Sequence, residues 1–394
     1  MKYCLGGAAF SGNKGASGML TALIQNIRHN DPDAKFAVLS YYPHADRKEH
    51  HGEDIEILDG SPLAVVGNFF RLALYKLHMP CGRDLRKITE CDRFLDAAGI
   101  TFVDGRVKFT IFNILTFIPA LAAGIPVIKV SQAMGPFDGA LNRLLAKIFL
   151  PRLKTIVARG DRSAQYLQEL GLNNVERFSD VAFSLECSEA DDRAAAALLP
   201  PLEGKKIIGF SPSRVVFGLC DKAGVDYLGE LEKVIRTLAQ EGFHCVIFPH
   251  SARSNTEKQH NNDLPLLRLL ARRLEGTENV TIIDRELGAG VLRRLIARFE
   301  LLVASRFHAI ISAMATGVPV AVIGWSHKYA EVLEPFELEN FVHPYTEFSA
   351  DGTLNAVHEI IRSRDELSKK IQCTADAIKA DNQRFFSRFK TNCS

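Results

Sequence analysis

The run 305–308, with the sequence Ser-Arg-Phe-His, carries the clearest chemical signal in this chain. It follows the apolar run 301–304, which predicts a buried strand, and precedes 309–316, which predicts a helix. The first N–H groups of a helix favour an anion, and ligands of open α/β sheets bind at the carboxyl ends of the strands. A fixed cation, Arg306, and a titratable imidazole, His308, at such a place predict the handling of a phosphate or a carboxylate.

Two further side chains hold the same kind of position in the second half of the chain. Arg214 follows the predicted strand 206–211, and His250 follows the predicted strand 245–248. Arginine binds phosphate and carboxylate groups through paired hydrogen bonds, so two arginines from neighbouring strand ends can hold one small anion. A lone histidine at a strand end is more often structural than catalytic. Because such a cluster costs stability when it has no ligand to bind, we interpret it as functional.

Three other positions give weaker signals. The glycine-rich segment 6–15 contains Asn13 but matches neither the dinucleotide-binding fingerprint nor the phosphate-binding loop of nucleotide hydrolases. A tight turn without a ligand explains this segment equally well. Gln132 follows a predicted strand and offers both a donor and an acceptor to a sugar or a phosphate, although a plain connecting loop is the alternative. Lys328 follows the last predicted strand, 318–323, and can close on the same anion as the arginines.

Strand-like and helix-like segments alternate almost throughout, which predicts an α/β protein. A chain of 394 residues is too long for one ordinary core, so we expect two Rossmann-like, doubly wound domains facing a cleft. The predicted domains are 1–187 and 204–353, joined by a polar, alanine-rich linker at 188–203. The closing helices, 354–394, are free to pack back on the first domain. The polar run 251–263 predicts a solvated loop rather than a motif.

Composition restricts the class of protein. The 48 basic and 46 acidic residues give a net charge of +2, so nothing global indicates a nucleic acid or an acidic membrane surface as partner. The eight cysteines include no C-x-x-C pair, which argues against a zinc site and a disulfide scaffold. We find no signal peptide, and no uninterrupted apolar run reaches the roughly 20 residues that span a bilayer. We therefore expect a cytoplasmic protein, beside a membrane or away from it, with no transmembrane segment.

Several of these motifs occur together in the order typical of one family. They are Asn13-Lys14-Gly15, the segments 132–137, 158–159 and 180–183, the run 305–308 with Gly317-Val318-Pro319 downstream, and Lys328. Together they resemble the polysaccharide pyruvyl transferase family, from about Gly7 to Leu333. The 305–308 run with its downstream glycine, valine and proline is the most specific of them.

The resemblance implies two Rossmann-like domains arranged as in GT-B glycosyltransferases. It also implies transfer of the enolpyruvyl group of phosphoenolpyruvate onto two hydroxyls of one sugar, with release of phosphate. The acceptor would be a saccharide on a lipid-linked or nucleotide-linked glycan precursor, and neither a metal nor a cofactor is demanded. The residues implied are Arg214, Ser305, Arg306, Phe307 and Lys328 for the donor, Asn13, Gly15 and Gln132 for the acceptor, and His308 for acid–base work with His250 in reserve.

Two other functions stay open from the sequence. A GT-B glycosyltransferase that uses a nucleotide sugar would need an acidic residue for the ribose hydroxyls, for which Glu331 and Glu334 are candidates. A relative that binds a glycan or an anion without turnover is the other alternative. It is favoured by Ala16, which stands where the family usually has an aspartate. It is also favoured by the Ala-Ala-Gly sequence at 97–99, which has fewer glycines than the loop that the family has at this place.

Overall fold

The computed structural model describes residues 1–394 except 50–53, 203, 254–260, 327 and 390–394. The chain is divided into two compact units, which are described separately. Unit 1 comprises Met1–Ser11, Ala16–Leu185 and Ala380–Ser394, and unit 2 comprises Gly12–Gly15 and Glu186–Lys379. Each unit has an apolar core of its own, built around its sheet.

Unit 1 contains a seven-stranded sheet in the order β3-β2-β1-β4-β5-β6-β7. Every neighbouring pair of strands is parallel. Central strands of such a sheet are covered on both faces, and in β5 every residue is buried, the polar Lys129 and Gln132 included. The strands are β1 (Lys2–Gly6), β2 (Lys35–Ser40), β3 (Ile55–Asp59), β4 (Arg93–Asp96), β5 (Val127–Gln132), β6 (Thr155–Ala158) and β7 (Val175–Arg177).

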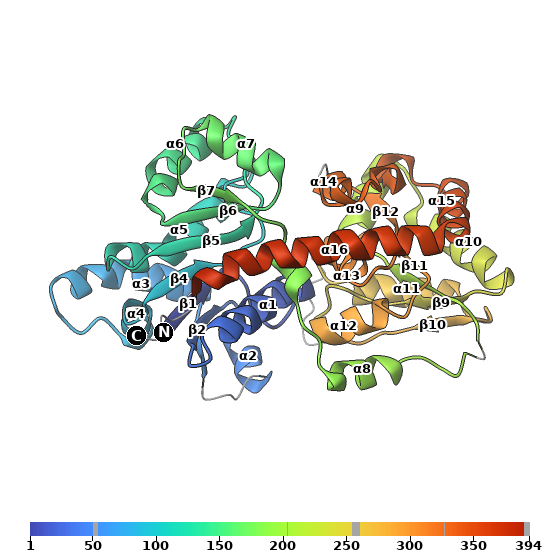
Figure 1. Cartoon of the computed structure of the whole chain (residues 1–394), viewed down its shortest axis with the longest axis horizontal. Coiled ribbons are helices and arrows are strands. Elements are labelled where there is room, and N and C mark those ends of the chain that lie inside the picture. The colour runs from blue at the N-terminus through green and yellow to red at the C-terminus, as the bar shows by residue number, and fades with distance from the viewer. Residues whose placement is uncertain (50–53, 203, 254–260, 327, 390–394) are drawn as a thin grey trace. The chain divides into compact units, whose positions relative to one another are not determined.

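Helices cover both faces of the unit 1 sheet (Figure 1). Right-handed crossovers between parallel strands place α3, α5 and α6 on one face and α1 and α2 on the other. In that layer α3 packs against α5, and α5 packs against α6. The helices are α1 (Lys14–Asn30), α2 (Pro43–Glu49), α3 (Pro62–Lys76), α4 (Arg83–Thr89), α5 (Val107–Ala122), α6 (Ala140–Phe149) and α7 (Asp161–Glu169), with short 3-10 turns η1 (Leu150–Arg152) and η2 (Val181–Ser184).

Unit 2 contains a six-stranded sheet in the order β10-β9-β8-β11-β12-β13, again parallel throughout. Its first strand, β8, lies beside its fourth, β11, so the strand order reverses between them. In doubly wound sheets ligands bind outside the carboxyl ends of the strands at this reversal. The strands are β8 (Ile207–Ser211), β9 (His244–Ile247), β10 (Val280–Ile282), β11 (Leu301–Ala304), β12 (Val320–Gly324) and β13 (Val342–Pro344).

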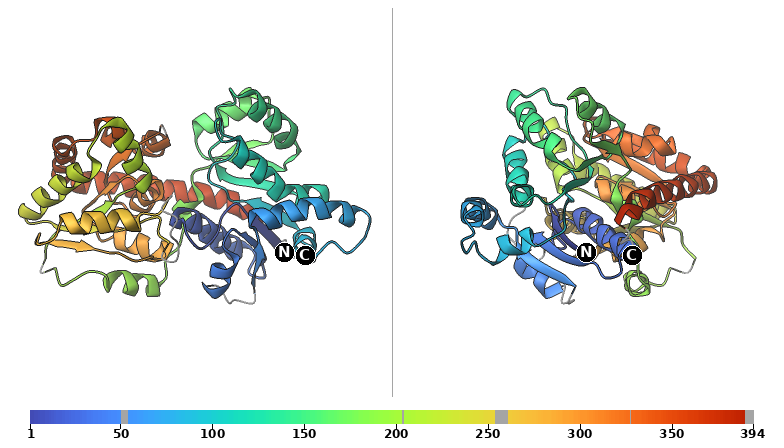
Figure 2. Two further views of the ribbon diagram at one scale, coloured as in Figure 1. Left: turned by 180° about the vertical axis from the view of Figure 1, so that it is seen from behind. Right: turned by 60° about the vertical axis from the view of Figure 1, so that its left-hand side comes forward.

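The unit 2 helices flank this sheet on both faces (Figure 2). The last helix, α16, begins in unit 2, and its residues from Ala380 onward belong to unit 1. The helices are α8 (Glu189–Ala196), α9 (Arg214–Ala223), α10 (Tyr227–Gln240), α11 (Leu264–Arg273), α12 (Ala289–Ile296), α13 (Phe307–Met314), α14 (Lys328–Leu333), α15 (Ala350–Arg362) and α16 (Arg364–Phe386), with 3-10 turns η3 (Glu334–Phe336), η4 (Glu339–Phe341), η5 (Tyr345–Glu347) and η6 (Ser387–Phe389).

The stretch expected to be a linker, 188–203, forms helix α8 over much of its length. Ser188 begins this helix with a capping box, because its hydroxyl accepts the N–H of Asp191 and the Asp191 carboxylate accepts the N–H of Ser188. The helix packs closely on α12, where a Cβ added to Gly290 would come within 2.6 Å of the Asp191 carboxylate. The alanine-rich composition on which the linker prediction rests also favours a helix, because alanine has the highest helix propensity.

Candidate functional site

A single buried carboxylate joins the ends of three strands of unit 2. Asp263 is fully buried and stands immediately before α11. Its oxygens accept the backbone N–H of Arg214, after β8, and of Ser251, after β9, both at 2.9 Å. The guanidinium of Arg306, after β11, donates through Nε at 2.9 Å and through Nη2 to the same carboxylate. Asp263 therefore joins three of the strand ends at the reversal of strand order.

The guanidinium of Arg306 is held by protein groups on two sides. Besides the paired bonds to Asp263, its Nη1 donates to Oδ1 of Asn261 at 2.6 Å. The side chain is only 13% exposed, and a cation buried to that extent needs a counter-charge. Two of its five N–H groups are not used by these bonds and can donate to a ligand. The guanidinium of Arg306 is thus held in one position by Asp263 and Asn261.

Arg214 is the more available of the two arginines. It begins α9, whose N-cap, Ser213, accepts the N–H of Val215. Its guanidinium carbon lies 4.8 Å from the ring centroid of Phe217. Within the described residues its side chain makes no ion pair. Stacking on a ring holds a guanidinium in place without using its hydrogen-bond donors.

The end of the glycine-rich segment, Gly12–Gly15, belongs to unit 2 and contacts His308. A Cβ added to Gly15 would lie 2.1 Å from Nδ1 of His308, so the backbone at this position packs directly on the imidazole. Asn13 accepts the N–H of Gly15 at 3.0 Å and pairs with Ser251 in an isolated antiparallel bridge. Two of the three residues implied for the acceptor, Asn13 and Gly15, therefore lie against Ser251 and His308 of unit 2.

His250 is buried behind this cluster. Burial, together with charge repulsion from the nearby His308 and Arg306, lowers its pKa to about 3. At neutral pH its imidazole is therefore uncharged and cannot act as a general acid. The reserve acid–base role implied for His250 does not fit this environment, whereas a neutral hydrogen-bonding role does.

The ammonium of Lys328 lies among three aromatic rings. Its Nζ is 4.6 Å from the ring centroid of Trp325, 5.3 Å from that of Phe307 and 5.6 Å from that of Tyr329. Cation–π contacts of this kind hold a cation in place. Lys328 thus packs on the ring of Phe307, the residue that follows Arg306 in the sequence.

Ser305 and Phe307 are packed into the core of unit 2 through their side chains. The hydroxyl of Ser305 is buried at 2.8 Å from the hydroxyl of Tyr227. The ring of Phe307 packs edge-on against His308 and against Tyr329. These two residues fix the start of α13 and the orientation of their neighbours. A direct contact with a ligand would have to come from their backbone.

Gln132 lies in unit 1 and is fully buried. Its Nε2 donates to the carbonyl of Asp96 at 2.7 Å, and its Oε1 accepts from the hydroxyl of Thr101 and from Nζ of Lys129. The amide predicted to face a sugar is thus committed to hydrogen bonds within unit 1.

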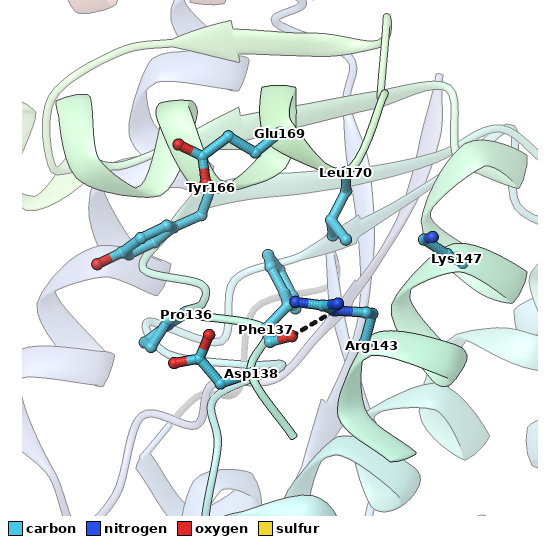
Figure 3. A pocket seen from close by; sticks show the side chains of 8 residues that line it. All are labelled: Pro136, Phe137, Asp138, Arg143, Lys147, Tyr166, Glu169 and Leu170. Carbon is cyan, nitrogen blue, oxygen red and sulfur yellow. Dashed lines mark hydrogen bonds between the residues drawn. The ribbon is translucent and has the colours of Figure 1, made fainter. Parts of the chain in front are cut away.

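A small pocket of about 200 Å³ lies in unit 1, beside the loop that follows Gln132 (Figure 3). The side chains around it carry both signs of charge and one phenol. Arg143 is fixed at its edge, because its Nε donates to the carbonyl of Phe137 at 2.7 Å. None of the residues predicted for the site lines this pocket. It is lined by Pro136, Phe137, Asp138, Arg143, Lys147, Tyr166, Glu169 and Leu170.

Asp263 and Asn261 are the site residues that the sequence analysis missed. The interpretation of 251–263 as a solvated loop is wrong at this end of the segment, because both side chains bind the Arg306 guanidinium. An acidic residue directly before an apolar helical run was the available signal. Within the described residues, no group of three histidine, cysteine, aspartate or glutamate side chains could hold a metal ion.

Several solved structures are similar to this chain in architecture. They include Anabaena HepE in complex with UDP-glucose (TM-score 0.58, 12% identity, covering 98% of this chain and 97% of that one). They also include S. aureus MnaA with UDP (TM-score 0.59, 13% identity, covering 98% of this chain and 94% of that one). A third is the UDP-GlcNAc 2-epimerase of Methanocaldococcus jannaschii (TM-score 0.60, 13% identity, covering 92% of this chain and 93% of that one). At such low identity these similarities establish the fold, which is of the GT-B type.

No curated protein sequence matches this chain significantly. The profile of one family, described as polysaccharide pyruvyl transferase, matches residues 13–327. That match begins at Asn13 and includes the Asp263 cluster, the 305–308 run and Gly317, so it covers most of the chain and ends just before Lys328. The chain therefore belongs to the polysaccharide pyruvyl transferase family, a family of transferase enzymes.

Proposed function

We propose that this protein transfers the enolpyruvyl group of phosphoenolpyruvate onto two hydroxyls of one sugar in a glycan or glycan precursor. The observation that carries the proposal is that Asp263 joins the guanidinium of Arg306 to the backbone N–H of Arg214 at the strand reversal of unit 2, with His308 in the first turn of α13. Phosphoenolpyruvate presents a phosphate and a carboxylate close together, which suits two guanidinium groups and a nearby ammonium. We expect the reaction to take place in the cytoplasm without a further cofactor.

The reaction balances as an addition followed by a displacement. A proton joins the methylene carbon of phosphoenolpyruvate, and the first sugar oxygen bonds to the adjacent carbon, which carries the phosphate. The second sugar oxygen then bonds to that carbon, the carbon–oxygen bond to phosphate breaks, and inorganic phosphate leaves. The two hydroxyl protons balance the proton gained by the new methyl group and the proton gained by the departing phosphate. The ketal therefore forms without oxidation or reduction.

His308 is the residue we propose for proton transfer, because an imidazole is the side chain that titrates nearest neutral pH. The backbone of Gly15 packs against its ring and limits the positions the ring can take. Arg214 and the two spare N–H groups of Arg306 would neutralise the departing phosphate. Lys328, held by its aromatic neighbours, would add a third positive charge.

A nucleotide sugar is the second candidate donor, because Anabaena HepE and S. aureus MnaA share this architecture and bind UDP-glucose and UDP. Thermal unfolding in the presence of each ligand separates the two. A ligand that binds the folded state at 100 times its Kd stabilises it by about 2.7 kcal/mol. We expect phosphoenolpyruvate to raise the Tm and UDP or UDP-glucose to leave it unchanged. The reverse result would replace the proposal with the nucleotide-sugar reaction.

Substitution of Arg214 tests the donor site most cleanly. Arg214→Ala should weaken phosphoenolpyruvate binding at least tenfold, in line with the roughly 1.5–3 kcal/mol of a hydrogen bond to a charged group, with little change in Tm. Calorimetric titration measures the affinity. Arg268→Ala, which breaks an exposed ion pair with Asp284 in the same unit, is the matched control and should bind normally. Equal binding by both variants would place the donor elsewhere.

A further inference from the structure

The outer surface of unit 1 is apolar where helices α3, α5 and α6 face away from the sheet. Among the described residues, every exposed large hydrophobic side chain except Met1 and Leu269 lies on these helices or just after α3. On α3, Leu63, Val66 and Phe70 recur at intervals of three and four residues, so they form one stripe along the helix. Leu63 is 88% exposed and Phe70 is 70% exposed. A helix normally turns such a stripe toward the core.

The neighbouring helices extend this stripe into a continuous surface, which we call the apolar face. Phe109 on α5 is 70% exposed, and Leu141 and Leu144 on α6 are about half exposed. Because α3 packs on α5 and α5 on α6, the three helices form one layer on one side of the sheet (Figure 2). Apolar patches of this extent on a soluble protein mark a surface that binds something.

The charged residues carried by the three helices of the apolar face are all basic, and Asp138 and Glu169 lie beside Arg143 and Lys147 at the pocket of Figure 3. Helices α3, α5 and α6 contain no aspartate or glutamate, although the whole chain has nearly as many acidic as basic residues. The charged residues of these helices are Arg71, Lys76, Lys108, Arg143 and Lys147. Protruding aromatic and aliphatic side chains interspersed with lysine and arginine are typical of helices that lie in the interface of an anionic membrane.

From these observations we infer that unit 1 docks on the surface of an anionic phospholipid bilayer through the apolar face. Within the described residues no helix is long and apolar enough to cross a membrane, so the contact is one of surface insertion. A second copy of the chain fits less well. In a two-fold interface the same positive charges would face one another. This inference does not depend on the proposed function, but it would place the enzyme where a lipid-linked saccharide acceptor is available.

Flotation of the purified full chain with lipid vesicles tests the inference. The protein should float with vesicles of equal parts phosphatidylcholine and phosphatidylglycerol, and much less with phosphatidylcholine alone. Binding should weaken as salt is raised, because each lysine or arginine near the surface contributes through a screened charge. A chain that fails to float with the anionic vesicles at low salt would overturn the inference.

Two variants assign the binding to the apolar face. Leu63→Gln with Phe70→Gln removes its most exposed apolar side chains, and Lys108→Glu with Lys147→Glu reverses two of its charges. Each should lower the fraction of protein bound by about tenfold or more. Leu269→Gln with Lys222→Glu, which alters exposed residues of unit 2, is the matched control and should bind normally.

The same variants exclude a second copy of the chain as the occupant. Light scattering should give the same mass for the unmodified chain and for Leu63→Gln with Phe70→Gln. A dimer that this variant converts to a monomer, together with absent vesicle binding, would assign the face to self-association and overturn the inference. Phosphate release with a water-soluble acceptor should stay unchanged in the variant, so failure of docking and failure of the proposed reaction are told apart.

Discussion

Each unit has a buried ion pair near the reversal of its strand order, but the two pairs differ in what surrounds them. In unit 1, Nζ of Lys129 lies 2.6 Å from Asp96, and both side chains are almost completely inaccessible. In unit 2, Arg306 pairs with a fully buried Asp263 while part of its guanidinium reaches the surface. The same topology therefore supports an entirely internal pair in one unit and a partly open one in the other.

The partners of each cation explain this difference. Lys129 also donates to Asn113 at 2.7 Å and lies 5.1 Å from the ring centroid of Phe102, so its ammonium is fully engaged. Burial lowers its pKa, and Asp96 opposes that shift. Arg306 has five N–H groups in a rigid fork, which is enough to satisfy Asp263 and still serve a ligand. We infer that the Lys129–Asp96 pair of unit 1 stabilises the fold and that the Arg306–Asp263 pair of unit 2 orients a guanidinium toward a ligand.

The largest expected effect is on the internal pair. Lys129→Met leaves the Asp96 carboxylate buried without its counter-charge, which should cost about 3–5 kcal/mol of unfolding free energy in urea. The affinity of the folded variant for phosphoenolpyruvate should not change. The double variant Asp96→Asn with Lys129→Met removes both charges and should recover most of the loss. A tenfold weaker affinity of the folded Lys129→Met variant for phosphoenolpyruvate would show that the unit 1 pair also contributes to ligand binding.

A smaller effect is expected where the glycine-rich segment contacts His308. Gly15→Ala places a methyl group in the space of the imidazole and should cost about 1–3 kcal/mol, as overpacking of a core does. Turnover should fall more than donor affinity, because the ring that moves is the one proposed to transfer the proton. Gly218→Ala is the matched control. It lies within α9 with open space around it, and it should be neutral or slightly stabilising. Normal turnover in Gly15→Ala would separate His308 from the reaction.

The smallest effect is the loss of stability over the first pH unit below about pH 6.5, and it belongs to unit 2. The pKa of His250 is about 3 in the folded chain and about 6.5 when unfolded, so the unfolded state binds the extra proton between these values. Stability is therefore complete above about pH 6.5 and falls with decreasing pH, by up to about 1.4 kcal/mol per pH unit from this group. Urea unfolding at a series of mildly acidic pH values measures the slope. His250→Gln should flatten it, and an unchanged slope would contradict the assignment.

Local patterns predicted the elements that carry the site. The strand at 301–304 is β11, and the helix after it is α13, which ends just before Gly317 at a φ of +75°. Weak elements escaped prediction because they are short or polar. The edge strand β13 has three residues, and α8 lies in the alanine-rich stretch that was interpreted as a linker. Such segments take their structure from packing against neighbours that the local sequence does not contain.

The sequence by itself determined the two parallel sheets and the placement of arginine and histidine at strand ends, because both follow from periodicity along short stretches of chain. Only the tertiary structure decided which of those charges are already paired. Arg306 meets Asp263 and His308 meets Gly15 across long separations in sequence, and these contacts depend on the order in which the strands assemble. Such a charge and its partner come together only when the chain folds, because they are far apart in the sequence. A local sequence pattern therefore does not predict which two groups will pair.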